Sequence, residues 1–300
     1  MTKSAASELS IWTALVIVYV VWGSTYLAIR IAVESIPPLA MAGVRFLIAG
    51  GVLLAWRMAV LKNSQQRITV RHWRSAAIVG ASLMLGGNGG VALAEKTVPS
   101  GITALIIATV PLWIALVDRL FYRRTLPLPR LAGLVIGFGA VAALVWRPDV
   151  SGLDVAGAFI AVAAAISWAA GSVYARSAEL PDDASTAIGM EMVAGGLLLV
   201  ISAAIAGEFR DPLLFHPSAS SVWAFIYLVV FGALVGFSAY LWLLRVAPIA
   251  RVSTYAYVNP VVAVALGWIV LREPIGAHTI AAGAAILASV ALIVWEPKKS

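Results

Sequence analysis

The side chains best suited to bind a small molecule lie inside long apolar stretches. Trp22 and Tyr26 are four residues apart and share one helix face, and Ser24 lies between them. Trp168 and Ser172 have the same spacing in a later stretch. Aromatic rings also anchor helices at membrane interfaces. Because Trp22 and Trp168 lie well inside their stretches, we favour a role in lining a binding cavity, where rings stack and their polar groups bond.

A glycine-rich segment surrounds Asn88, since residues 86–90 read Gly-Gly-Asn-Gly-Gly. Glycines weaken a helix and let another backbone approach closely, and the Asn88 amide offers both donors and an acceptor. Exposed backbone groups at this depth are tolerated only against protein or a wet cavity. Asn88 is therefore a candidate for substrate binding, and tight helix packing explains the glycines equally well.

Two prolines, Pro111 and Pro260, lie inside apolar stretches 149 residues apart. Each removes a helical hydrogen bond and frees a carbonyl one turn earlier. We expect both prolines to act as hinges, and the freed carbonyls could also bind an ammonium group. Trp113 lies next to the first proline, and Tyr255 and Asn259 precede the second. These three are candidate substrate-binding residues.

Arg45 and Glu191 are the charged residues placed deepest in the apolar stretches. Charges at such depth usually face the protein interior and mark functional sites. Arg45 could bind a substrate carboxylate, and Glu191 could bind an ammonium group or carry a proton. A purely structural role is the alternative for each.

The sequence lacks the arrangements that enzymes and metal proteins use. There is no cysteine, and His72, His216 and His278 are too scattered to share a metal ion. No phosphate-binding loop or nucleophile motif is present. We therefore expect neither an enzyme nor a cofactor. The net charge of +7 comes from basic residues in short loops, which favours a lipid bilayer over nucleic acid as the partner.

The elements that carry these residues are predicted to be membrane-spanning helices. The chain is 62% hydrophobic and 12% charged, with a mean hydropathy of +0.96. Lipid cannot satisfy exposed backbone groups, so long apolar stretches must be helical. The predicted spans are residues 11–33, 38–56, 74–95, 101–121, 131–146, 155–177, 185–206, 221–244, 252–271 and 276–295. The expected fold class is an all-α membrane protein with ten transmembrane helices.

The basic residues predict the orientation of the chain. With the N-terminus in the cytoplasm, 15 of the 21 Lys and Arg residues fall on the cytoplasmic side. An even number of spans then returns the C-terminus to the same side. We expect a multi-pass protein of a bacterial-type inner membrane with both termini cytoplasmic.

The two halves of the chain repeat each other. Residues 23–26 (Gly-Ser-Thr-Tyr) match residues 171–174 (Gly-Ser-Val-Tyr), and Pro111 matches Pro260. Residues 1–150 and 151–300 are thus predicted to be two copies of one five-helix unit. Because five is odd, the second copy enters the membrane inverted, as in many secondary transporters with a central cavity.

Four motifs make the chain resemble the EamA family of the drug/metabolite transporter superfamily. They are Trp22-Gly23-Ser24, Arg45-Phe46 after Pro37-Pro38, the paired prolines, and Leu271-Arg272-Glu273-Pro274. Within that family the chain is most similar to the YddG-type exporters of amino acids. The resemblance implies ten helices around a central cavity and outward transport of small metabolites. The family places a glutamate after the ninth span, here Glu273. The matching residue in the first half is Arg124, which weakens the idea that two equivalent glutamates act as a functional pair.

An aromatic cavity with few charges suits a neutral zwitterion with an apolar side chain. Export of neutral or aromatic amino acids by alternating access is therefore the first hypothesis. Export of lipophilic cations is the alternative, because aromatic rings bind cations too. A non-transporting receptor or an intramembrane enzyme is the third. Gly133 and Gly137 form a close-packing pair that could meet the last span or the partner of a homodimer.

Overall fold

The computed structural model describes residues 7–60, 67–122, 128–145, 154–210, 216–247, 252 and 254–294. In this part of the chain the regular elements are all helices, so the prediction of an all-α protein is confirmed. Arg124, Trp146 and Trp295 lie outside the described residues.

The first half runs through seven α-helices and one π-helical segment. They are α1 (Glu8–Ala32), α2 (Pro38–Val60), α3 (Val70–Gly80), η1 (Ala81–Gly89), α4 (Gly90–Ala94), α5 (Ser100–Ile107), α6 (Val110–Tyr122) and α7 (Leu128–Val145). The segments α3, η1 and α4 follow one another without a break and form one long helical stretch.

The second half has a similar succession. Its elements are α8 (Val155–Ala175), α9 (Ala184–Ile205), the short η2 (Glu208–Arg210), α10 (Ala219–Tyr227), η4 (Leu228–Val235), α11 (Gly236–Val246), α13 (Tyr255–Leu271) and α14 (Ala277–Val294). Here α10, η4 and α11 join into one stretch. The two π-helical segments η1 and η4 begin at Ala81 and Leu228.

The helical stretches have the length and composition of membrane spans. Seven of them are long and apolar enough to cross a bilayer, and three shorter apolar helices cover residues 131–144, 255–271 and 277–292. Each overlaps one of the spans predicted from the sequence. The chain is therefore a multi-pass membrane protein.

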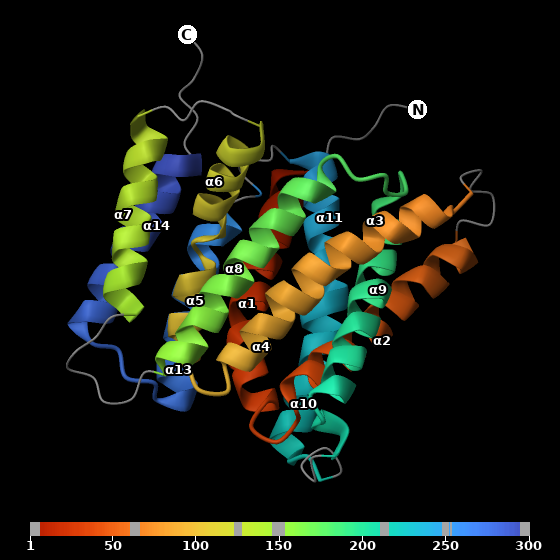
Figure 1. Ribbon diagram of the computed structural model, residues 1–300, viewed down its shortest axis with the longest axis horizontal. Helices are drawn as coiled ribbons and strands as arrows, with labels where there is room; N and C mark the ends of the chain where they lie inside the picture. Colours follow the sequence, from red (N-terminus) through yellow and green to blue (C-terminus); the bar gives the residue numbers. More distant parts are fainter. Residues whose placement is uncertain are drawn as a thin grey trace.

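The helices pair in a consistent pattern. The most extensive contacts are those of α2 with α9 and of α7 with α14, followed by α1 with α13, α8 with η1, and α3 with α9; α6 with α8 and α5 with α13 come next. Figure 1 shows α7 and α14 side by side at one end of the molecule and α2, α3 and α9 at the other. The start of α1 and the end of α14 lie at the same edge, which we call the terminal edge; the opposite one is the distal edge.

Polar side chains cap the starts of several helices. Ser7, Asp154, Asp183 and Ser218 each accept a hydrogen bond from a backbone N–H of the following first turn. The Asp154 carboxylate also accepts a bond of 2.7 Å from Thr97 Oγ1. This hydrogen bond lowers the pKa of Asp154, because it stabilises the charged form.

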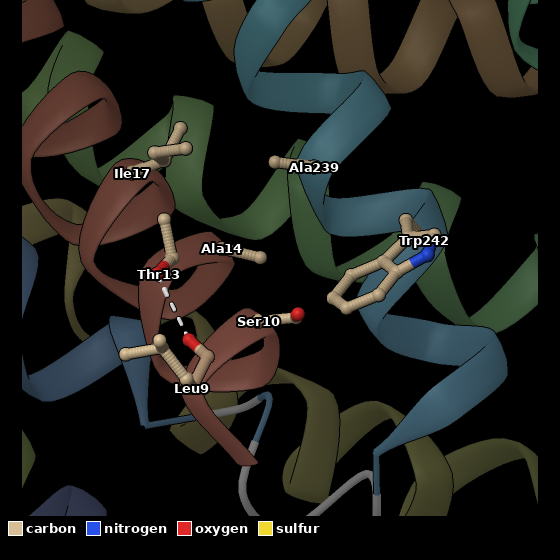
Figure 2. Close-up of a pocket in the computed structure, with 7 residues that line it drawn as sticks. All are labelled: Leu9, Ser10, Thr13, Ala14, Ile17, Ala239 and Trp242. Carbon is tan, nitrogen blue, oxygen red and sulfur yellow. Dashed lines mark hydrogen bonds between the residues drawn. The ribbon is translucent and has the colours of Figure 1, made fainter. Parts of the chain in front are cut away.

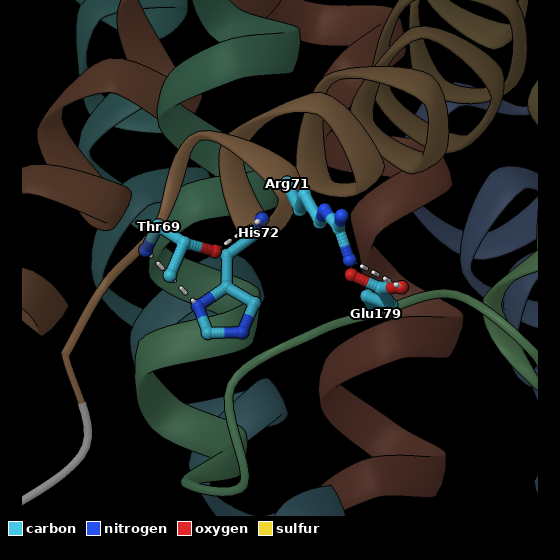
Figure 3. A network of polar contacts seen from close by, with 4 residues as sticks. All are labelled: Thr69, Arg71, His72 and Glu179. Atoms are coloured by element: carbon cyan, nitrogen blue, oxygen red, sulfur yellow. Dashed lines mark hydrogen bonds and ion pairs between the residues drawn. The ribbon is translucent and has the colours of Figure 1, made fainter.

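Contacts at the two edges hold different helices together. At the terminal edge, Arg71 of α3 forms an ion pair of 3.8 Å with Glu179, beyond the end of α8 (Figure 3). Thr69 and His72 cap α3 next to it. At the distal edge, the Ser218 backbone N–H donates to Ser35 Oγ at 2.9 Å, and Ser221 Oγ donates to the Ile31 carbonyl at 2.8 Å.

Glycines allow the closest helix approaches. At Gly50 of α2, an added Cβ would lie 2.8 Å from the Gly189 carbonyl oxygen of α9. At Gly137 of α7, it would lie 2.0 Å from Leu112 Cδ2 of α6 and 2.7 Å from Ser289 Oγ of α14. Gly137 therefore packs against helices of its own chain, including the last one.

The adjacent glycines of α2 provide a matched test of this packing. Gly50→Ala should lower the free energy of unfolding by about 1–3 kcal/mol, because the new methyl overlaps the α9 backbone. Gly51→Ala should be neutral or stabilising, because nothing lies within 4 Å of its Cβ position. Thermal unfolding of the detergent-purified variants measures both. Equal midpoints for the two variants would contradict the α2–α9 contact.

Candidate functional site

An aromatic cluster surrounds Trp22 near the middle of α1. Its ring centroid lies 5.2 Å from Phe237, 5.1 Å from Tyr240 and 5.3 Å from Tyr255. Phe237 and Tyr240 come from α11, and Tyr255 begins α13. We call these four residues the aromatic cluster. Trp22 and Tyr255, both predicted from the sequence, are thus brought together, and their edge-on geometry is a favourable one for aromatic rings.

Hydrogen bonds fix this cluster to the neighbouring helices. Trp22 Nε1 donates to the Gly232 carbonyl of η4 at 3.2 Å. One turn further along, Gly236 leaves room for the indole, since a Cβ there would lie 2.3 Å from Trp22 Nε1. The Tyr19 and Thr254 hydroxyls are also bonded, which joins α1 to the start of α13. The ring of Trp22 therefore has a defined position and is half-buried.

Arg45 approaches the same point of η4 from α2. Its side chain is only 4% exposed, and its Nε has no hydrogen-bond partner. The guanidinium lies 4.8 Å from the centre of the Phe46 ring. A Cβ added to Gly232 would lie 3.1 Å from Arg45 Nη2 and 3.0 Å from Thr25 Cγ2. Gly232 is therefore the place where a buried cation and the aromatic cluster meet.

Ser24 and Tyr26 continue the α1 face toward the distal edge. Ser24 Oγ is hydrogen-bonded to the Tyr227 hydroxyl of α10 at 2.6 Å. Tyr26 is half-buried and packs against the same hydrophobic cluster as Tyr227. Both predicted residues thus lie along the same seam as the aromatic cluster.

The second half brings its candidates to a different place. Trp168 of α8 packs on Gly87 of η1, where an added Cβ would lie 2.7 Å from the indole Cε3. Ser172 donates to the Trp168 carbonyl at 2.7 Å, and Asn88 donates to the Leu83 carbonyl at 3.1 Å. No contact joins this group to the aromatic cluster within the described residues. Asn88 and Ser172 are partly engaged with their own helices.

The two prolines have different surroundings. A break at residues 108–109 separates α5 from α6, and Pro111 is the second residue of α6. The break is bridged by Trp113, which donates to Thr109 Oγ1 at 3.1 Å, and Trp113 also stacks against Phe138 of α7 at 4.5 Å. Trp113 therefore faces α7 and lies apart from the aromatic cluster.

Pro260, in contrast, lies within the unbroken helix α13. Next to it, the surroundings of the buried Asn259 amide favour the orientation in which its nitrogen donates to the Tyr19 and Tyr255 carbonyls, at 3.2 and 3.1 Å. This amide connects α13 to α1. Asn259 therefore holds the helices that carry the aromatic cluster, and a substrate would have to compete for its donors.

Glu191 is buried in α9, apart from the aromatic cluster. Its side chain is 7% exposed. The neighbouring helix comes very close, because a Cβ at Gly80 of α3 would lie 2.6 Å from the Glu191 carbonyl oxygen. The structure thus places Glu191 at the packed crossing of α3 and α9.

A cluster of ionisable groups at the distal edge was not predicted as a site. Glu95, at the end of α4, is fully buried, and neither carboxyl oxygen has a hydrogen-bond partner. Arg30 of α1 donates to the Glu95 backbone carbonyl. The Glu273 carboxylate accepts from the Ser100 N–H at 2.8 Å and the Gly101 N–H at 3.1 Å, and so caps α5.

An open groove of about 470 Å³ lies between the start of α1 and α11. Figure 2 shows Leu9, Ser10, Thr13, Ala14, Ile17, Ala239 and Trp242 around it. The groove is mostly apolar. It follows the same α1–α11 seam that holds Trp22 and Tyr240 further along, and its volume is in the range of small-molecule sites.

Several residues of these sites escaped the sequence analysis. Phe237 and Tyr240 are three residues apart in an apolar stretch, a spacing that puts both on one helix face and could have indicated them. Glu95 and Arg30 were not selected; they lie near the ends of the predicted spans 74–95 and 11–33. Gly232 had no signal, since its importance comes from the two side chains that meet on it.

The fold and this site define a membrane protein with polar groups gathered inside a helical bundle. A model of the EamA-like transporter family matches residues 10–146 and again residues 155–295. The chain belongs to the EamA-like transporter family.

Individual relatives agree with this assignment. The uncharacterized inner membrane transporter YedA of Escherichia coli K12 is 44% identical over 260 residues, which are 86% of this chain and 82% of YedA. The uncharacterized transporter YvbV of Bacillus subtilis is 23% identical over 95% of this chain and 92% of its own. A solved crystal structure shares the fold with a TM-score of 0.62, at 21% identity, and covers 95% of this chain and 96% of its own.

The α5 cap gives a testable consequence. Glu273→Ala should lower the free energy of unfolding by about 1–2 kcal/mol, because buried backbone donors of α5 lose their acceptor. Glu34→Ala, at an exposed glutamate of the same edge, is the control and should be neutral. Thermal unfolding in detergent compares them. The cap is refuted if both variants unfold with the wild-type midpoint.

Proposed function

We propose that this protein exports neutral or aromatic amino acids across a bacterial inner membrane, as the YddG-type exporters do. The observation that carries the proposal is the meeting of Arg45 and the aromatic cluster at Gly232. A buried guanidinium with an unbonded Nε requires an anion. A carboxylate next to aromatic rings describes an amino acid with an apolar side chain.

Each part of such a substrate has a matching group. Arg45 would bind the carboxylate through charge-assisted hydrogen bonds. The rings of Trp22, Tyr240 and Tyr255 would take the apolar side chain and attract the ammonium group. The carbonyl of Ala256, one turn before Pro260, lacks its helical donor and could accept from the ammonium. The groove at the start of α1 would be the entrance from the terminal edge.

The carboxylate separates this proposal from export of lipophilic cations. In proteoliposomes, wild-type protein should exchange labelled phenylalanine but not phenethylamine, which lacks only the carboxylate. Arg45→Gln should weaken phenylalanine binding roughly ten- to hundredfold, since a hydrogen bond to a charged group contributes about 1.5–3 kcal/mol. Counterflow of both compounds measures the selectivity.

Two variants of α1 test the aromatic cluster independently of Arg45→Gln. Trp12→Ala changes an exposed tryptophan of the same helix as Trp22 and should leave exchange intact. Trp22→Phe keeps a ring in the aromatic cluster but loses the bond to Gly232, so it should weaken binding without unfolding the protein. Efficient exchange of phenethylamine by the wild type would favour the lipophilic-cation alternative and overturn this proposal.

The proposed architecture is ten helices in two inverted five-helix repeats, residues 1–150 and 151–300, around a central cavity. Three observations support it. The family model matches the chain twice. The π-helical segments η1 and η4 start 147 residues apart. The contact of α1 with α13 has a counterpart in the contact of α8 with α6. In an inverted repeat, exchange of the two copies' shapes gives alternating access.

Contacts at equivalent positions of the two halves lie at opposite edges and fit this exchange. Arg71 is paired with Glu179 at the terminal edge. Ser218, which is 147 residues after Arg71, is bonded to Ser35 at the distal edge. An exposed ion pair contributes little, whereas the serine contacts join α1 directly to α10. We infer that the distal edge is the closed one in this structure. With the termini in the cytoplasm, this would be an inward-open form. A homodimer stays a prediction.

The prolines test the exchange of shapes. Pro111→Ala and Pro260→Ala should each slow turnover more than they weaken binding, because restored helical hydrogen bonds stiffen the helices while the aromatic cluster stays. Pro111 and Pro260 belong to copies that are expected to be inverted in the membrane, so the two variants should favour opening to opposite sides. The chain has no cysteine, so single introduced cysteines can be labelled from each side. Identical labelling with normal turnover would exclude the hinge role.

A further inference from the structure

We propose that Glu95 is a proton-binding site that couples the transport cycle to a proton gradient. The inference rests on the transport function proposed above and deepens it by naming the coupling ion and its residue. Its basis is the buried position of the Glu95 side chain, which has no part in the substrate binding proposed for the aromatic cluster and Arg45.

Glu95 is placed where a charged carboxylate is costly. It is 0% exposed, and both carboxyl oxygens are buried without a hydrogen-bond partner. A buried ion without compensating bonds is strongly unfavourable, and a carboxyl group in such surroundings takes up a proton. Glu95 is therefore neutral in this conformation.

The charged and titratable groups around Glu95 come from several elements. Arg30 and Tyr26 face it from α1, and Glu273 faces it from the segment after α13. Asp154, before α8, is bonded to Thr97 and its own helix. The residues of α5 are all uncharged. The neighbouring Glu273 carboxyl group accepts two backbone hydrogen bonds at the α5 N-terminus, and two carboxyl groups close together disfavour the ionisation of both.

Arg30 supplies the alternative state. Its guanidinium donates to the backbone carbonyl of Glu95, at the end of α4, rather than to the carboxyl group. When Glu95 loses its proton, the carboxylate becomes the stronger acceptor for Arg30. Arg30 would then leave the Glu95 backbone carbonyl. Protonation of Glu95 thus decides whether Arg30 of α1 binds its carbonyl or its carboxylate. One proton is bound or released at the carboxyl oxygen, and no other bond changes.

The link to the substrate site runs along α1. Tyr26 is one helical turn beyond Trp22 of the aromatic cluster and lies on the same face of α1. Arg30 is one helical turn beyond Tyr26 on the same face. A movement of α1 that follows proton release therefore reaches the aromatic cluster directly.

A proton fits this place better than a sodium ion. Sodium needs several oxygen ligands, whereas the side chain that is hydrogen-bonded to the Glu95 backbone is the cation Arg30. A second cation beside it would be repelled. The ligand is thus the smallest cation, bound covalently by the carboxyl group itself.

Infrared spectroscopy tests the site without any transport assay. Purified wild-type protein at neutral pH should show a protonated-carboxyl band that is weaker in Glu95→Gln and unchanged in Glu34→Gln, which alters an exposed glutamate. Glu95→Gln should also keep the wild-type unfolding midpoint at neutral pH, since it replaces one neutral group with another. An unchanged band in Glu95→Gln overturns the proposal.

Transport in proteoliposomes tests the coupling. A pH difference of one unit should drive roughly tenfold accumulation of labelled phenylalanine by wild-type protein and by Glu34→Gln, as expected for one proton per substrate. For Glu95→Gln, the ratio of uptake with and without the pH difference should fall to one. A gradient response kept by Glu95→Gln, or a wild-type response to sodium alone, overturns the proposal. Absence of phenylalanine exchange by wild-type protein would instead count against the proposed function, and the infrared band would then decide the protonation of Glu95 by itself.

Discussion

The need to satisfy backbone hydrogen bonds without water governs this structure. In a bilayer an unpaired N–H or C=O has no solvent to bond to, so the chain must be helical wherever it crosses. The starts of the helices then need acceptors from elsewhere. Glu273 gives two backbone donors of α5 a carboxylate, and Glu208 does the same for the start of α2. Distant segments are tied together because their helix ends must be bonded.

Close approach of these helices creates the candidate site. Where glycine replaces a larger residue, backbones come near enough for long side chains to reach across a helix. Gly232 is the clearest case, since Trp22 and Arg45 both lie against it from different helices. Gly87 plays the same part for Trp168. The π-helical segments that hold both glycines place these crossings in corresponding parts of the two halves.

Buried charge is the second constraint, and the charged side chains differ in whether the fold gives them partners. Glu273 is held by an α-helix N-terminus, and Arg71 and Glu179 meet at the exposed terminal edge. Arg45 and Glu95, by contrast, are buried with polar atoms unbonded. Buried polar groups usually have a hydrogen-bond partner, so a buried charge with an unbonded atom is a candidate for binding a ligand. Arg45 and Glu95 are therefore the two charges that we connect to substrate and proton.

The sequence by itself determined the helical class, the positions of the apolar stretches and several residues of the aromatic seam. Hydropathy and helix spacing are local properties, so Trp22, Tyr26 and Tyr255 could be selected without a structure. Only the tertiary structure decided which of them meet. Trp113 turned to α7 and Asn259 to the α1 backbone, because their partners come from distant helices. Nothing in the local sequence marks Glu95 as buried, and yet it is fully buried in the folded chain. Burial depends on which helices become neighbours, and that is a long-range property no local pattern contains.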